Sequence, residues 1–248
     1  MEKHPYPLPV GEPALPSPLM TTHFVLLPSP LLGAAVWEPV ATELRGSGQV
    51  ATVVVLPGPV RSPVDVLEGF FSSLPDEPVV LVPHSNAGLF VPALAERHSV
   101  LATVFVDAAL PPTDAPTTTP ASGAFYEFLT KKADARGVLP AWTRWWSEEE
   151  VSGLFPDAAT RERVEKQQQH LPLTYFAEAL TVPQGWDAEP CAYLAFGDTY
   201  ADETRVARER RWSVAVTSGG HLDMLWNPAR VAQHVQRLAD EVRNADSR

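Results

Sequence analysis

The stretch Val79-Val-Leu-Val-Pro-His-Ser-Asn-Ala-Gly88 is an apolar run that ends abruptly in small and polar residues. Four successive apolar residues without polar alternation are typical of a strand that is covered on both faces. From Asn86 to Arg97 the apolar spacing changes to that of a helix. Ser85 is therefore expected on the turn between a buried strand and a helix, with its hydroxyl at the helix N-terminus, where free backbone N–H groups stabilise negative charge.

Short apolar runs of the same kind alternate with helical patterns along most of the chain. The expected strands are Phe24 to Leu27, Val50 to Leu56, Val79 to Val82, Val100 to Val106, Ala192 to Phe196 and Ser213 to Val216. The expected helices are Ala35 to Arg45, Val64 to Leu74, Asn86 to Arg97, Asp202 to Arg211 and Pro228 to Arg243. This alternation predicts an α/β fold with a mainly parallel sheet and helices on both of its faces.

One segment breaks the alternation. Residues 111–190 contain no good strand pattern but several tryptophans among charged residues, which predicts a helical cap. An insertion between two parallel strands lies naturally over their carboxyl ends, where open α/β folds bind ligands. Residues 21–110 and 191–248 then form the core, and the proline-rich residues 1–20 form an extended arm.

The charge, the cysteine content and the lengths of the apolar runs disfavour several classes of partner and location. The chain has 19 basic and 30 acidic residues, a formal charge of -11, so neither nucleic acid nor an anionic membrane is an expected partner. Its single cysteine, Cys191, excludes an internal disulfide, and no stretch is long and apolar enough to span a bilayer. We expect a cytoplasmic protein that acts on a small-molecule substrate, either as a monomer or as a homodimer. The absence of zinc-binding and nucleotide-binding motifs predicts no metal and no cofactor.

The turn His84-Ser85-Asn86-Ala87-Gly88 is similar to the G-H-S-x-G-G turn of the α/β-hydrolase superfamily. The resemblance covers most of the chain and includes Trp37-Glu38-Pro39-Val40, the cap insertion, and Gly220-His221 with Asn227-Pro228. It implies the α/β-hydrolase fold, with Ser85 as nucleophile and His221 as general base. A carboxylate would hold the imidazole in the correct tautomer.

Two aspartates compete for the role of that carboxylate. The usual family slot, three residues after Gly197, holds Tyr200. Asp107, which ends a predicted strand, occupies a position that some family branches use and is preferred; Asp198 is the alternative. An aspartate at the end of a strand also serves simply to stabilise a turn, so Asp107 has a purely structural interpretation as well.

The resemblance also implies two backbone N–H donors for an oxyanion. Asn86 supplies the first, but the family's second donor follows the first strand, and here that turn reads Pro28-Ser29-Pro30-Leu31. Because proline has no N–H, either the Leu31 N–H or the Ser29 hydroxyl must substitute. The predicted substrate pocket is lined by Pro30, His84, Trp142, Trp145, Trp146 and Tyr175.

These residues predict a serine hydrolase of the carboxylesterase or thioesterase class, acting on an ester, thioester or lactone of a small to medium apolar molecule. Two alternatives keep the fold. One is a non-hydrolytic biosynthetic enzyme of the cyclase or lyase type, since the prolines alter the backbone that stabilises an oxyanion. The other is a ligand-binding protein without turnover.

Overall fold

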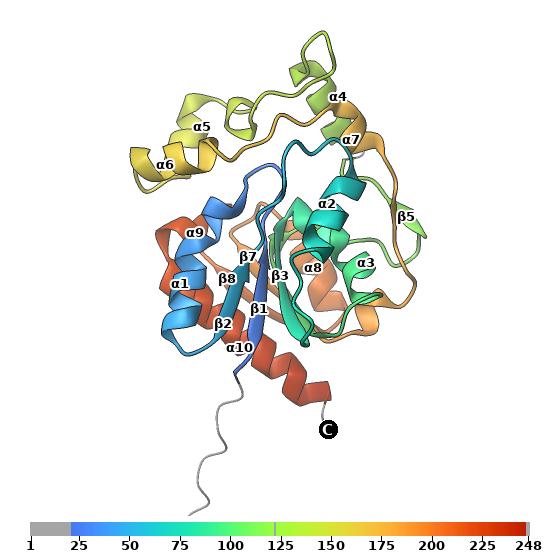
Figure 1. Ribbon diagram of the computed structural model, residues 1–248, viewed down its shortest axis with the longest axis vertical. Coiled ribbons are helices and arrows are strands. Elements are labelled where there is room, and N and C mark those ends of the chain that lie inside the picture. The colour runs from blue at the N-terminus through green and yellow to red at the C-terminus, as the bar shows by residue number, and fades with distance from the viewer. Residues whose placement is uncertain (1–20, 122, 247–248) are drawn as a thin grey trace, which may run out of the picture.

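The computed structural model describes residues 21–121 and 123–246, so the predicted arm, residues 1–20, lies outside the described residues. Within those ranges the centre is a six-stranded sheet in the order β2-β1-β3-β4-β7-β8, with every neighbouring pair parallel (Figure 1). The strands are β1 (His23–Leu27), β2 (Val50–Val53), β3 (Val79–Ser85), β4 (Val100–Ala108), β7 (Cys191–Phe196) and β8 (Ser213–Thr217). All six predicted strands are present.

Helices cover both faces of the sheet, which confirms the predicted fold class. Figure 1 shows α1 (Glu38–Gly46), α9 (Asp223–Trp226) and α10 (Pro228–Asp246) on one face, with α2 (Pro63–Phe71), α3 (Val91–Ala95) and α8 (Ala201–Glu209) on the other. Between β1 and α1 lies a 3-10 turn, η1 (Ala34–Val36). No helix in the described ranges combines the length and the apolar character that a bilayer span requires.

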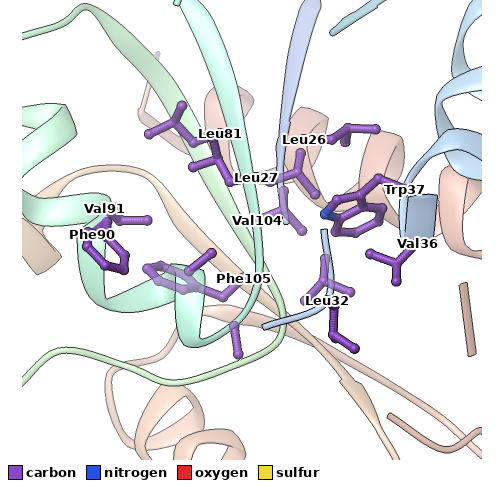
Figure 2. Close-up of a cluster of buried hydrophobic side chains, with 14 of the residues drawn as sticks. Leu26, Leu27, Leu32, Val36, Trp37, Leu81, Phe90, Val91, Val104 and Phe105 are labelled. Carbon is purple, nitrogen blue, oxygen red and sulfur yellow. The ribbon is translucent and has the colours of Figure 1, made fainter. Parts of the chain in front are cut away.

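The core explains why the central strands are continuous apolar runs. Every residue of β3 is buried, because helices cover both of its faces. Figure 2 shows Trp37 and Phe90 among the apolar side chains that pack against the sheet, together with Phe105 of β4. All three rings are fully buried, and each contributes about 1.5–3 kcal/mol relative to an exposed side chain. This packing fixes the carboxyl ends of β3 and β4.

Between β4 and β7, residues 123–177 lie over the carboxyl ends of the strands, and residues 182–190 return beside the sheet to the amino end of β7 (Figure 1). Their helices are α4 (Gly123–Lys132), α5 (Glu148–Ser152), α6 (Ala158–Glu165) and α7 (Leu173–Ala177), with 3-10 turns η3 (Trp142–Arg144) and η4 (Trp186–Ala188). The expectation of no strand here is wrong: β5 (Thr117–Thr118) and β6 (Leu180–Thr181) form an antiparallel pair. A strand of only two residues is too short to show an alternating pattern, so this pair cannot be recognised from the sequence.

Three successive glutamines after α6 join this cap segment to its surroundings. The Ala35 N–H donates to Gln167 Oε1 at 2.8 Å, and the Val60 N–H donates to Gln169 Oε1 at 2.7 Å. Gln168 Oε1 accepts from both the backbone N–H and the hydroxyl of Thr143, each at 3.1 Å, inside the cap. The cap is therefore bound by side-chain amides to the loops that follow β1 and β2.

Candidate active site

Ser85 occupies a strained turn at the end of β3. Its φ of 57° and ψ of -130° lie in a region that residues with a Cβ rarely adopt, at a typical cost of about 1–3 kcal/mol. The turn can close because Gly88 passes next to β4: a Cβ at that position would lie 2.1 Å from the Ala109 carbonyl oxygen. A strained serine that the surrounding packing holds in place is typical of a functional site.

The helix predicted after Ser85 is divided in two. Residues Asn86–Phe90 form a 3-10 helix, η2, and α3 follows, with Pro92 at its second position. The Val91 N–H donates to the Gly88 carbonyl, which the proline ring would otherwise leave unpaired. The backbone N–H of Asn86 is the first of η2 and has no acceptor within the helix.

The side chain of Asn86 is held on both sides. Its amide nitrogen donates to the Pro120 carbonyl at 3.1 Å, and its oxygen accepts from the Tyr175 hydroxyl at 3.2 Å. Asn86 and Tyr175 are buried, so these two bonds fix the residue that follows Ser85. Tyr175, predicted as a pocket residue, therefore supports the turn from the cap side.

Asp107, not Asp198, contacts His221. The Nδ1–H of His221 donates to Asp107 Oδ2 at 2.6 Å, and Asp107 Oδ1 accepts the Phe196 N–H at 3.0 Å. Asp107 is fully buried at the end of β4, with a φ of 42° that aspartate tolerates better than most residues. Asp198, the alternative acid, is exposed, and in the described part of the chain the carboxylate that bonds to His221 is that of Asp107.

The loop that carries His221 is fixed by a second aspartate, Asp223. This buried carboxylate accepts from the Thr217 hydroxyl at 3.2 Å, the Asn227 amide at 2.7 Å and the Arg230 guanidinium at 2.9 Å. A Cβ at Gly219 would lie 2.2 Å from the Asp223 carboxyl carbon, so only glycine fits beside it. These contacts connect β8, the His221 loop and α10.

His84, predicted as a pocket residue, lies beneath His221 and is fully buried. Its Nε2–H donates to the His221 carbonyl at 3.0 Å, and the two imidazole rings stack with centroids 4.5 Å apart. Burial, with the neighbouring His221, holds the pKa of His84 well below its usual range. His84 is therefore a neutral ring that supports His221 from below.

The neutral state of His84 should make the fold sensitive to acid. Below its ordinary pKa of 6.5 the unfolded chain binds a proton at this site and the folded chain does not. Unfolding therefore becomes easier as pH falls through this range, by roughly 1 kcal/mol for one unit below 6.5. Urea unfolding at pH 7.5 and 5.5 should show this extra loss in the wild type and not in His84→Gln. Equal losses in the two proteins would contradict a depressed pKa.

The predicted tryptophans divide between the site and the packing of the cap. The Trp142 ring lies 6.1 Å from the His221 ring, and Trp146 is 38% exposed beside it. Trp145 is only 2% exposed; its indole N–H donates to the Pro140 carbonyl and its ring packs against Phe176. Trp145 is thus part of the cap's own core, whereas the Trp142 ring lies next to that of His221.

The turn after β1 is compact and buried. The Ser29 carbonyl accepts the N–H groups of Leu32 and Gly33, at 3.0 and 3.1 Å. The Leu31 N–H, one of the two predicted substitutes for the second oxyanion donor, donates to Ser29 Oγ at 3.3 Å. Ser29 and Pro30 are both buried. The Leu31 N–H is therefore engaged within the turn, and the hydroxyl proton of Ser29 is the donor left over.

Tyr200 lies at the site although it was not among the predicted site residues. Its hydroxyl is 3.3 Å from Ser85 Oγ, and its ring centroid is 5.7 Å from that of His221. In the described part of the chain Ser85 Oγ bonds to Tyr200 and has no hydrogen bond to His221. The only signal in the sequence was position: Tyr200 fills the slot three residues after Gly197.

Comparisons with known proteins give matches only among solved structures; no protein-family model and no curated protein matches the chain. An Arabidopsis methylesterase is 16% identical with a TM-score of 0.69, covering 89% of this chain and 99% of its own. Polyneuridine aldehyde esterase is 18% identical (TM-score 0.63; 89% and 100% covered). Tomato methylketone synthase I, complexed with 2-tridecanone, is 16% identical (TM-score 0.60; 90% and 100%). At these identities the likeness concerns the fold alone.

Proposed function

We propose that this chain, whose fold is that of the α/β-hydrolases, is a serine hydrolase acting on an ester, thioester or lactone of a small to medium apolar molecule. The observation that carries the proposal is the 2.6 Å contact between His221 Nδ1 and Asp107 Oδ2, beside a serine on a strained turn. A buried carboxylate on Nδ1 leaves Nε2 as the proton acceptor, which is the tautomer a general base requires.

In the proposed reaction Ser85 Oγ attacks the substrate carbonyl while His221 Nε2 takes its proton. When substrate binds, the Ser85 hydroxyl gives up its hydrogen bond with Tyr200 and donates to His221 Nε2 instead. Hydrogen bonds between catalytic groups often form only in the complex with substrate. The Asn86 N–H stabilises the oxyanion at the start of η2. His221 then protonates the leaving oxygen. In the second half of the reaction water attacks the acyl carbon while His221 takes its proton, and that proton returns to Ser85 Oγ as the acyl group is released.

A row of aromatic rings supports the apolar substrate class. It runs from His221 to Trp142 (6.1 Å), Trp146 (6.3 Å) and Phe128 (5.3 Å), and ends at Phe125 (6.2 Å). Trp146 and Phe125 are 38% and 40% exposed. Aromatic rings in contact from partly exposed Phe125 and Trp146 as far as His221 favour an apolar acyl or alcohol group over a sugar or a peptide. We therefore propose that the substrate contacts Trp142 while it reacts.

A second candidate function has one specific observation in its favour. The turn after β1 lacks the usual N–H donor, because Pro28 and Pro30 flank Ser29 and the Leu31 N–H is engaged. Loss of one oxyanion donor costs about 10²–10³ in rate, which disfavours acyl transfer. A non-hydrolytic reaction of the lyase or cyclase type, using His221 as acid and base, needs no acylated serine.

Covalent labelling separates these candidates. The intact protein is incubated with a fluorophosphonate, or mixed with p-nitrophenyl butyrate, and the products are measured by mass spectrometry and by nitrophenol release. We expect one phosphonyl adduct per chain on Ser85, none on Ser85→Ala, and faster hydrolysis of the butyrate than of the acetate ester. A folded wild-type protein without an adduct would contradict the hydrolase and favour the non-hydrolytic reaction.

A further inference from the structure

We propose that Tyr200 is a further catalytic residue: its hydroxyl donates a hydrogen bond to the leaving-group oxygen of the substrate. The inference rests on the proposed hydrolase function and adds a second group to the departure step. Its basis is the 3.3 Å contact between the Tyr200 hydroxyl and Ser85 Oγ, with the Tyr200 ring 5.7 Å from His221. No other side chain in the described residues bonds to Ser85 Oγ.

The order of the sheet places Tyr200 on the side of the leaving group. Ser85 ends β3, and β1 lies on one side of β3 while β4, β7 and β8 lie on the other. Tyr200 follows β7, and His221 follows β8. The turn with Pro28 and Pro30 follows β1, on the opposite side of Ser85 from both. The leaving oxygen must lie near the group that protonates it, so Tyr200 faces that oxygen together with His221.

The hydroxyl remains a donor throughout the working pH range. Burial, followed by the charges of Asp107 and Glu203, raises the pKa of Tyr200 above its usual range, although the bond to Ser85 opposes this shift. Because the phenol stays neutral, it donates a hydrogen bond and keeps its proton. Apart from Ser85, the described residues offer that hydroxyl no partner, so a substrate oxygen can replace Ser85 as its acceptor.

The departure step balances without further reactants. The Ser85 Oγ–carbon bond has formed, and the tetrahedral intermediate collapses with cleavage of the bond between carbon and the leaving oxygen. The proton on His221 Nε2 moves to that oxygen, while Tyr200 only stabilises the negative charge that develops there. The benefit should be large for an alcohol, which leaves poorly as an anion, and small for p-nitrophenol, which leaves well without help.

Leaving-group dependence therefore tests the role. Wild type and Tyr200→Phe are compared on ethyl butyrate and p-nitrophenyl butyrate, which share the acyl group. We expect kcat for ethyl butyrate to fall by about 100-fold in the variant and kcat for p-nitrophenyl butyrate to fall by only about 5-fold. KM for both esters should stay nearly constant. Tyr200→His, which retains a ring N–H donor, should recover part of the loss on ethyl butyrate.

A matched control is Tyr193→Phe. The Tyr193 hydroxyl is also buried on the β7 side of the site, but it bonds only to the backbone of Ala108, at 2.7 and 3.0 Å. Its removal should change both esters by the same factor. If Tyr200→Phe also lowers both esters equally, or lowers neither, Tyr200 does not act on the leaving group. If the wild type hydrolyses neither ester and Ser85 takes no phosphonate, the hydrolase proposal itself has failed.

Discussion

Ser85→Ala is expected to lower kcat for p-nitrophenyl butyrate on the order of 10⁶-fold, to the residual rate that binding and the Asn86 N–H support. The loss is large because, in the proposed mechanism, Ser85 forms the covalent bond in the first half of the reaction and no neighbouring hydroxyl can replace it. Tyr200, the nearest, has a pKa raised by burial and remains protonated. Stopped-flow detection of nitrophenol, with active-site titration of the wild type, measures the ratio.

Ser85→Gly separates loss of the nucleophile from relief of backbone strain. Glycine adopts a φ of 57° freely, whereas alanine keeps the strain that serine bears there. Both variants should be equally inactive, but the glycine variant should be at least as stable as the alanine variant in urea unfolding. Activity above about 1% in either variant would be inconsistent with Ser85 as nucleophile, since triad knockouts lose far more.

Asp107→Asn is expected to lower kcat about 10⁴-fold with little change in KM. Asparagine fits the space and tolerates a φ of 42°, so the backbone should keep its path. If the amide oxygen keeps the Phe196 N–H as its donor, the NH2 group faces His221 Nδ1 and favours the wrong imidazole tautomer. The flipped amide would accept from Nδ1–H but would leave the Phe196 N–H unpaired, which costs free energy.

Asp198→Asn is the matched control for this variant. It is the same chemical change at the competing position, and Asp198 is exposed. Its kcat should stay within about two-fold of the wild type, as for a surface substitution away from any network. A large loss at Asp198 together with a small loss at Asp107 would contradict the assignment of the acid.

The fold could be predicted from the sequence because burial on both faces makes each central strand a continuous apolar run. Val79 to Val82 and Val100 to Val106 show this directly, and their helices follow at regular intervals. The pair β5 and β6 could not be predicted, since two residues show no periodicity. The division of the helix after Ser85 was signalled by Pro92, but the 3-10 geometry of its first part was not.

The candidate site could be predicted only as far as chain order allows. Ser85 and His221 follow strands in a recognisable way, but the choice between Asp107 and Asp198 depends on which carboxylate reaches His221 in space. Asp107 and His221 are 114 residues apart. Tyr200 was not predicted as a site residue. Its position, where the family has its acid, indicated only that the carboxylate lies elsewhere, and chain order does not reveal that its hydroxyl contacts Ser85 Oγ.

The glutamine contacts of the cap define what can be exchanged in protein engineering. A cap transplanted at residues 111–190 would lose the acceptors that Gln167 and Gln169 supply to the Ala35 and Val60 N–H groups. Two backbone donors on the loops beneath it would then need new partners, or water. The transferable module is therefore larger than the inserted sequence, because it includes the loops around Ala35 and Val60. Chimeras that move the cap and these two loops together should keep the contacts between the cap and the core.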